Sequence, residues 1–274
     1  NPSPAKFCFQ QDGHMMIHIE KKINAAWMLI FACLMILMAV IGGVKNYSPI
    51  PFWDMWNAVY AFVLDAEGGG FSIWWSQHNE HRIVLARILF WIDYYFFNLQ
   101  SIFLVVVNYI CVGLSGVLFF CYLNKISKER GIDGSTTLPL GLFVFGWLFV
   151  WTQKENLTWA FQPEFFLAQL LPLSVFYFLV TSEAKKYDGR FFLACLLGIL
   201  SAGTLANGVE ALPLAFILSC FLPIHRGKRG VLLLLAIVTP LVYFYGYQQP
   251  PGHGSLTKTL INDPIGVLHY SMIY

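Results

Sequence analysis

The chain has 274 residues, of which 57% are hydrophobic and 12% are charged, and its mean hydropathy is +0.61. This composition excludes an ordinary soluble domain, in which about a quarter of the residues are charged, and predicts an all-α protein that crosses a membrane several times. The formal net charge is only +2, and the cations are distributed by membrane side, so membrane lipids are expected as partners and nucleic acid is not.

Residues 1–23 form a polar leader, in which no cleavable signal peptide is expected because no short apolar run precedes a small-residue cleavage site. Apolar segments follow, several of them shorter than the ~20 residues that a helix needs to cross a bilayer. Seven spans are predicted, at residues 24–44, 101–123, 138–151, 163–180, 191–206, 209–223 and 231–247. The chain ends in a polar segment, and the natural protein is expected to continue into further spans.

The lysines and arginines orient the predicted spans. With a cytoplasmic N-terminus, five of the 17 cations lie in outer segments, namely Lys45, Arg82, Arg87, Lys154 and Lys258. The other twelve lie in inner segments: Lys6, Lys21, Lys22, Lys125, Lys128, Arg130, Lys185, Lys186, Arg190, Arg226, Lys228 and Arg229. Because cytoplasmic loops carry an excess of basic residues, this asymmetry supports seven spans with the N-terminus inside.

The long first outer loop, residues 45–100, holds most of the polar chemistry of the chain. Residues 81–97 are apolar but carry Arg82, Arg87 and Asp93, each of which costs roughly 2.5 to 3.5 kcal/mol at a bilayer centre. We therefore expect an amphipathic helix on the outer membrane surface, and a second one at residues 51–64. The three glycines at 68–70 predict a flexible joint between the two helices.

The predicted architecture consists of one span, a long outer loop with two surface helices, and then a bundle of spans. It resembles the N-terminal module of the GT-C class of membrane glycosyltransferases. The run FWDMW at residues 52–56 carries an acidic residue, Asp54, early in the first outer loop. The runs HNEHR at 78–82 and ENLTWAFQ at 155–162 look similar to segments of bacterial membrane proteins of suspected GT-C type. The resemblance covers nearly the whole chain and implies transfer of a sugar from a polyprenyl-phosphate carrier on the outer side of the membrane.

In that class an acidic residue at this place is the catalytic base, so the resemblance implies this role for Asp54. The alternative is that Asp54 caps a helix or pairs with an arginine. Arg82, with His78 or His81, is the candidate site for the leaving phosphate, because a guanidinium binds phosphate oxygens bidentately. The alternative for Arg82, and more so for Arg87, is contact with lipid headgroups.

A divalent metal ion is a further possibility, with His78, Glu80 and His81 as candidate ligands. The pattern differs from HExxH, and on a helix Glu80 would lie off the face shared by the two histidines. Glu80 is equally a candidate second acid or acceptor-binding residue.

Two outer turns bring polar residues to the same membrane face as Asp54. One turn contains Glu155 and Gln162, and the other contains Asn207 and Glu210. Their convergence predicts one outer cavity lined by Glu155, Gln162 and Glu210, although outer turns are polar in any case.

The sequence therefore predicts an inverting GT-C type transferase of cell-envelope glycan biosynthesis, in the plasma (inner) membrane of a bacterium. The donor would be a polyprenyl-phosphate sugar and the acceptor a glycan, a lipid or a protein. One alternative is a transporter or flippase of lipid-linked sugars, although transporters concentrate ionisable residues near the midplane. The other alternative is a non-catalytic scaffold subunit that docks a partner through its loop.

Overall fold

The computed structural model describes the backbone of residues 4–250 and 256–273, and the side chains of residues 23–250, 258–270 and 272. The described residues form helices and no strands, which confirms the all-α prediction. Among the described residues, five helical stretches are long and apolar enough to cross a membrane: Ile23–Asn46, Ile102–Arg130, Gly134–Thr158, Pro163–Thr181 and Arg226–Phe244. The protein is therefore membrane-embedded.

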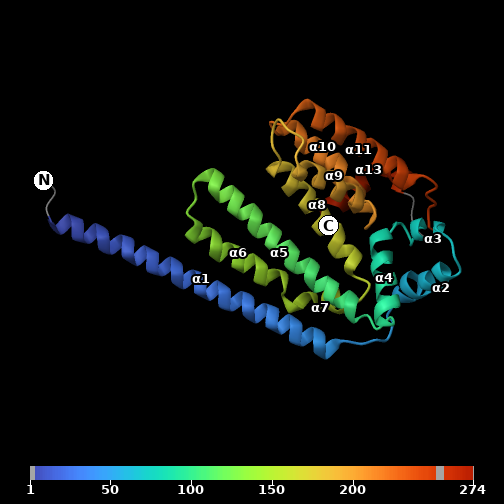
Figure 1. The fold of residues 1–274 in the computed structure, drawn as a ribbon, viewed down its shortest axis with the longest axis horizontal. Coiled ribbons are helices and arrows are strands. Elements are labelled where there is room, and N and C mark those ends of the chain that lie inside the picture. The colour runs from blue at the N-terminus through green and yellow to red at the C-terminus, as the bar shows by residue number, and fades with distance from the viewer. Residues whose placement is uncertain (1–3, 251–255, 274) are drawn as a thin grey trace.

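The first half of the bundle is built on a very long helix, α1 (Pro4–Asn46), which includes most of the predicted leader. It packs along α6 (Gly134–Leu148), and α6 packs in turn against α5 (Ile102–Arg130) (Figure 1). A Cβ added at Gly146 would lie 2.8 Å from the Cα of Ala32. The absence of a side chain at Gly146 thus allows α1 and α6 to approach closely, as small residues do between membrane helices.

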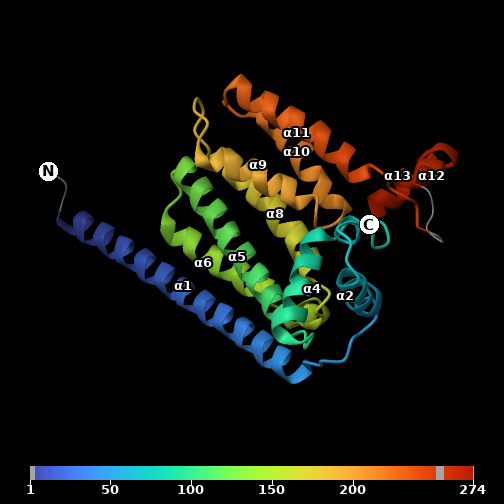
Figure 2. The ribbon, with the colours of Figure 1, turned by 45° about the vertical axis from the view of Figure 1, so that its right-hand side comes forward.

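The second half consists of α8 (Pro163–Thr181), α9 (Gly189–Ser201), α10 (Ala211–Phe221) and α11 (Arg226–Phe244). Helix α8 packs against both α5 and α9, while α10 packs against α11. Val175, Phe191, Leu212 and Leu232 belong to one buried apolar cluster that joins the four helices. The two halves are thus held together through α5 and α8, side by side in both views (Figures 1 and 2).

The predicted spans at 191–206 and 209–223 are shorter in the structure. Helix α9 ends at Ser201, and a tight turn leads to the short 3-10 helix η3 (Ala206–Glu210) and α10. In this turn the N–H groups of Gly203 and Thr204 donate to the carbonyls of Leu200 and Ser201. A Cβ at Gly208 would lie 2.0 Å from the carbonyl oxygen of Ser201. The turn thus depends on backbone packing at a glycine, which hydropathy does not detect.

The first outer loop is a folded unit at one end of the bundle (Figure 1). It contains the π-helix η1 (Trp56–Ala61) and helices α2 (Phe62–Glu67), α3 (Ser72–Trp75) and α4 (Val84–Phe97). Their buried faces form one apolar cluster with Leu104 of α5 and Ala168 of α8. The loop helices are therefore packed on the bundle by an apolar core of their own.

The loop helices differ in their limits from the predicted ones. The first begins at Trp56 rather than near Pro51, and α4 begins at Val84 rather than at His81. Between α2 and α3 lie the three glycines, where Gly69 has a φ of +81°. The helices therefore end at the predicted joint.

Two short elements, η2 (Trp151–Gln153) and α7 (Lys154–Thr158), connect α6 to α8 at the same end of the bundle as the loop. Beyond α11, the described chain forms α12 (Leu256–Asn262) and α13 (Pro264–Ile273). Both lie near the loop end in Figure 2.

Candidate functional site

Asp54 lies at the entrance to the loop unit, directly before η1. Its backbone carbonyl accepts hydrogen bonds from the N–H groups of Asn57 and Ala58, at 3.2 and 2.8 Å, and so begins the helix. Its side chain is half-buried, and its charge acts on both His78 and Glu164. The predicted base therefore lies near a group of ionisable side chains whose charges act on one another, which we call the Asp54 cluster and define as Asp54, His78, Arg87 and Glu164.

Glu164 is the member of the cluster that the sequence analysis does not single out. It is the second residue of α8, is 2% exposed, and its Oε2 atom has no hydrogen-bond partner among the described residues. Both Asp54 and Arg87 lie near enough for their charges to act on it. Acidic residues often open helices because they stabilise the N-terminal dipole, so nothing in the sequence distinguishes this glutamate.

His78 lies in a tight turn rather than on a helix. Its N–H donates to the carbonyl of His81 at 2.8 Å, and the N–H of His81 returns the bond at 3.0 Å. The imidazole packs edge-on against Phe161, with 5.6 Å between the ring centroids, and its Nε2 atom is buried without a partner among the described residues. Burial lowers the pKa of His78 below 6.5, although the charge of Asp54 opposes the change. His78 is therefore neutral at pH 7.

Arg87 is 4% exposed and points into the loop unit, which corrects the alternative that it contacts lipid headgroups. Its Nη1 atom donates to the carbonyls of Ile73, Trp74 and Ser76, at 2.9, 3.2 and 2.6 Å. Burial lowers its pKa to about 10, against the opposing effect of Glu164. Arg87 thus remains a cation at pH 7 and is fixed by backbone carbonyls at a place from which its charge acts on Glu164.

Arg82 joins the loop to the end of α11. Its Nε and Nη2 atoms donate to the carbonyls of Tyr243 and Tyr245, at 2.8 and 2.9 Å, and Nη1 donates to the carbonyl of Trp75. Arg82 is 4% exposed, and its guanidinium lies over the Trp75 ring, 5.2 Å from the centroid. Arg82 precedes α4 instead of lying on it, and its carbonyl bonds give it a structural role that the sequence analysis does not include. Phosphate binding by Arg82 stays a prediction.

Residues 78–81 form a turn, so the helical geometry expected for a metal site at His78, Glu80 and His81 does not apply. Because the two histidines face each other across a turn, they are not related by a helical spacing. Nδ1 of His81 accepts a hydrogen bond from the N–H of Ala206 at 3.2 Å, while the charge of Glu80 acts on both histidines. In the part of the chain that the structure describes, no three His, Cys, Asp or Glu side chains form a metal-ligand group.

The outer turns approach the loop only in part as predicted. The indole N–H of Trp159 donates to the carbonyl of Phe52 at 3.3 Å, and Ala206 contacts His81 as described above. Gln162 is buried at the start of α8, two residues before Glu164. Glu155 and Glu210 are exposed, so the structure does not bring these two side chains into the Asp54 cluster.

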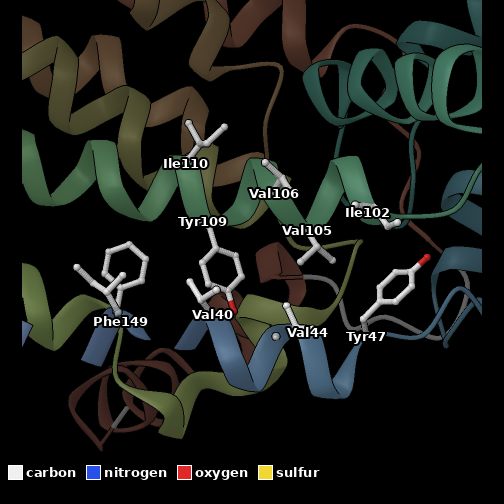
Figure 3. A pocket seen from close by; sticks show the side chains of 11 residues that line it. Val40, Val44, Tyr47, Ile102, Val105, Val106, Tyr109, Ile110 and Phe149 are labelled. Carbon is white, nitrogen blue, oxygen red and sulfur yellow. The ribbon is translucent and has the colours of Figure 1, made fainter. Parts of the chain in front are cut away.

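An apolar groove lies between α1 and α5, and it extends to the loop end of both helices (Figure 3). Its volume is about 580 Å³, and its lining includes Val40, Val44, Val106, Ile110 and Phe149. Tyr47 lies at one end of the groove, seven residues before Asp54 in the chain. Helix α1 packs mainly on α6, and its contact with α5 includes Tyr109, whose hydroxyl group donates to the carbonyl of Ala39 at 2.7 Å and whose side chain also lines the groove.

No protein-family model, curated protein or solved structure matches this chain.

Proposed function

We propose that the protein is a GT-C type glycosyltransferase that uses a polyprenyl-phosphate sugar as donor. The observation that carries this proposal is the position of Asp54. It lies in a cluster of ionisable side chains, at the same end of the bundle as an apolar groove in the membrane-embedded part. A transferase of lipid-linked sugars needs both features, a carboxylate at the membrane surface and an apolar path for the prenyl chain.

In this proposal Asp54 takes the proton from a hydroxyl group of the acceptor. The acceptor oxygen forms a bond to C1 of the sugar, while the bond between C1 and the phosphate oxygen breaks. Polyprenyl phosphate leaves with the electron pair, and the configuration at C1 is inverted. The acceptor is a glycan, a lipid or a protein. Glu155, Gln162 and Glu210 remain proposed contacts for substrate, of which Gln162 lies nearest in the chain to the cluster.

The cations of the loop are suited to a growing negative charge on the phosphate. Arg82 and Arg87 are each held by backbone carbonyls, so their charges are fixed before the reaction begins. Such fixed charges stabilise a transition state without having to reorganise. A divalent metal ion bound by His78, Glu80 and His81 remains an addition to the proposal, to be tested separately.

The proposal also includes the orientation. The basic ends of the helices face the cytoplasm, the loop unit lies on the outer face of a bacterial plasma membrane, and α9 with η3 and α10 completes seven crossings. If α9 and α10 instead entered and left on the same side, α11 would still begin inside, and the basic residues would keep their sides. The positive-inside pattern therefore supports this orientation in either case.

The scaffold alternative is favoured by one observation. Arg82 and Arg87 donate hydrogen bonds to carbonyls of the loop unit and of α11. Such bonds make the loop rigid, as a surface that docks a partner protein would need to be. The transporter alternative has less support. Among the described residues the buried charged side chains are Arg82, Arg87, Asp93, Glu164 and Lys228, and none lies in the middle of a candidate span.

The test compares Asp54→Asn with Asp65→Asn, which removes an exposed carboxylate of the same loop. Membranes with matched amounts of each variant are supplied with radiolabelled polyprenyl-phosphate sugar, and release of the label from the carrier is measured. We expect Asp54→Asn to lower release by about 10²-fold to 10⁴-fold, as loss of a general base does, and Asp65→Asn to leave it unchanged. Normal release from the Asp54→Asn membranes would exclude Asp54 as the base and favour the scaffold.

A further inference from the structure

A second pocket lies at the opposite end of the bundle from the Asp54 cluster. Its volume is about 520 Å³, and it is formed by the end of α5, the end of α8 and the beginning of α9. In Figure 2 the end of α5 lies beside the connection that follows α8. Under the proposed orientation this end faces the cytoplasm. The pocket is therefore separate from the proposed transfer site.

Cations from two helices meet in this pocket. Lys125 and Lys128 come from α5, and Arg190 comes from the first turn of α9. Lys125 and Arg190 line the same pocket as Tyr177, and the charges of both act on the hydroxyl group of Tyr177. Arg190 is held there, since Nη1 donates to the carbonyl of Thr181 at 2.8 Å.

The charge balance of the lining favours an anion. The acidic group in the lining is Glu129, which is paired with Lys125 at 2.7 Å and has a side chain 60% exposed. The three cations therefore outnumber it. Tyr177 and Asn124 add uncharged hydrogen-bond donors. Such a set of donors suits the oxygens of a phosphate group.

We propose that this pocket binds the phosphate headgroup of an anionic phospholipid of the cytoplasmic leaflet. A free phosphate ion would use only the cations and the polar donors. A phospholipid also uses the apolar side of the pocket, which Cys121 and Val180 provide where two membrane-crossing helices end. Basic pockets between helices on the cytoplasmic side of a membrane are suited to such headgroups. The proposal uses the orientation given above but not the glycosyltransferase activity.

The experiment measures lipid retained by the purified full-length protein, by native mass spectrometry after titration with phosphatidylglycerol or phosphatidylcholine. The wild type should retain phosphatidylglycerol in preference to phosphatidylcholine. The double variant Lys125→Gln/Arg190→Gln should weaken this retention by roughly ten-fold or more, since each cation near the surface contributes about five-fold. Arg130→Gln removes an exposed cation of the same helix end outside the pocket, and it should change retention less than two-fold, because an exposed charge that does not contact the bound headgroup is largely screened.

A further variant is expected to increase the retention of phosphatidylglycerol. Glu129→Gln removes the acidic group and releases Lys125, so it should increase retention of phosphatidylglycerol by about two-fold to five-fold. A misfolded variant would not produce such a gain. The proposal is overturned if Arg130→Gln weakens retention as much as the pocket variants do. It is also overturned if glycerol phosphate displaces the lipid at equal concentration, because the pocket would then bind a soluble anion.

Discussion

Arg82 donates two hydrogen bonds to Tyr243: its Nε atom donates to the backbone carbonyl at 2.8 Å, and its backbone N–H donates to the hydroxyl group at 3.1 Å. Gln77 and Gln248 exchange a second pair of bonds nearby, at 2.7 and 2.8 Å. With the bond from Nη2 of Arg82 to the carbonyl of Tyr245, five hydrogen bonds join the loop unit to the end of α11 and the residues directly after it. This connection keeps the Asp54 cluster at a fixed place on the bundle.

The first prediction concerns Arg82. Arg82→Ala should lower the free energy of unfolding by about 2 kcal/mol or more, because it leaves the buried carbonyl of Tyr243 and two part-buried carbonyls without their charged donor. Arg82→Lys should recover only part of this loss, since a lysine cannot reach three carbonyls in fixed directions. Thermal unfolding in detergent measures both, with the exposed Arg130→Ala as control. If Arg82→Ala had normal stability but released no sugar from the polyprenyl-phosphate donor, phosphate binding would be the main role of Arg82.

A second prediction separates stability from function at Glu164. Glu164→Gln keeps the volume of the side chain and removes a buried ionisable carboxyl group near Asp54, one oxygen of which has no hydrogen-bond partner among the described residues. Because burial of an incompletely partnered polar group is unfavourable, we expect the melting temperature to stay equal or rise. Release of sugar from the carrier should fall at the same time, since the variant changes the electrostatics of the base. Strong destabilisation would instead show that Glu164 holds the fold together.

The groove between α1 and α5 gives a third prediction. Val106 lines the groove and Val117 does not, although both are on α5 and their exposed fractions are 49% and 51%. Val106→Trp should fill the groove and reduce retention of polyprenyl phosphate by the purified protein by at least about ten-fold, because apolar contact area is lost. Val117→Trp is the matched control. Equal retention by the two variants would place the prenyl chain elsewhere.

A fourth prediction concerns pH. Burial lowers the pKa of both His78 and His81 from the usual 6.5, so the unfolded chain binds protons more readily than the folded protein does. Stability from these groups is fully present above pH 6.5 and decreases as the pH falls toward the lowered pKa values. Melting temperatures between pH 7.5 and 5 should therefore fall on acidification, and less steeply in His78→Gln. An unchanged slope in that variant would contradict the buried, neutral state of His78.

Much of the fold could be predicted because hydropathy reports directly which segments reside in a membrane. The spans at 24–44, 101–123, 138–151, 163–180 and 231–247 each overlap a helical stretch of sufficient length. The start of α9 was close to its prediction, but its end was wrong. The turn at Ser201 consists of small, mildly apolar residues, and its cause is a backbone approach at Gly208. Local hydropathy contains no such tertiary information.

The candidate site was predictable to a smaller extent. The sequence singled out Asp54 and His78, and in the structure the charge of Asp54 acts on the imidazole of His78. It misplaced His81 and Arg82 on a helix, although Asn79, with a φ of +50°, is the kind of residue that forms turns. It missed Glu164, because the burial of that residue results from the packing of the loop unit on α8. Sequence spacing thus identifies residues with chemical capacity, whereas tertiary packing decides which of them meet.

The brevity of α9 and α10 has a consequence for the lipid around the protein. Helix α9 has 13 residues and α10 has 11, so at 1.5 Å per residue they measure about 20 and 17 Å, well below the ~30 Å of a hydrocarbon core. A bilayer adapts to such short elements by becoming locally thinner. Next to these two helices the leaflet on the side of η3 should dip toward the bundle, and water should reach deeper there than around α1. The thinned side of the membrane would then adjoin the turn in which Ala206 donates to His81.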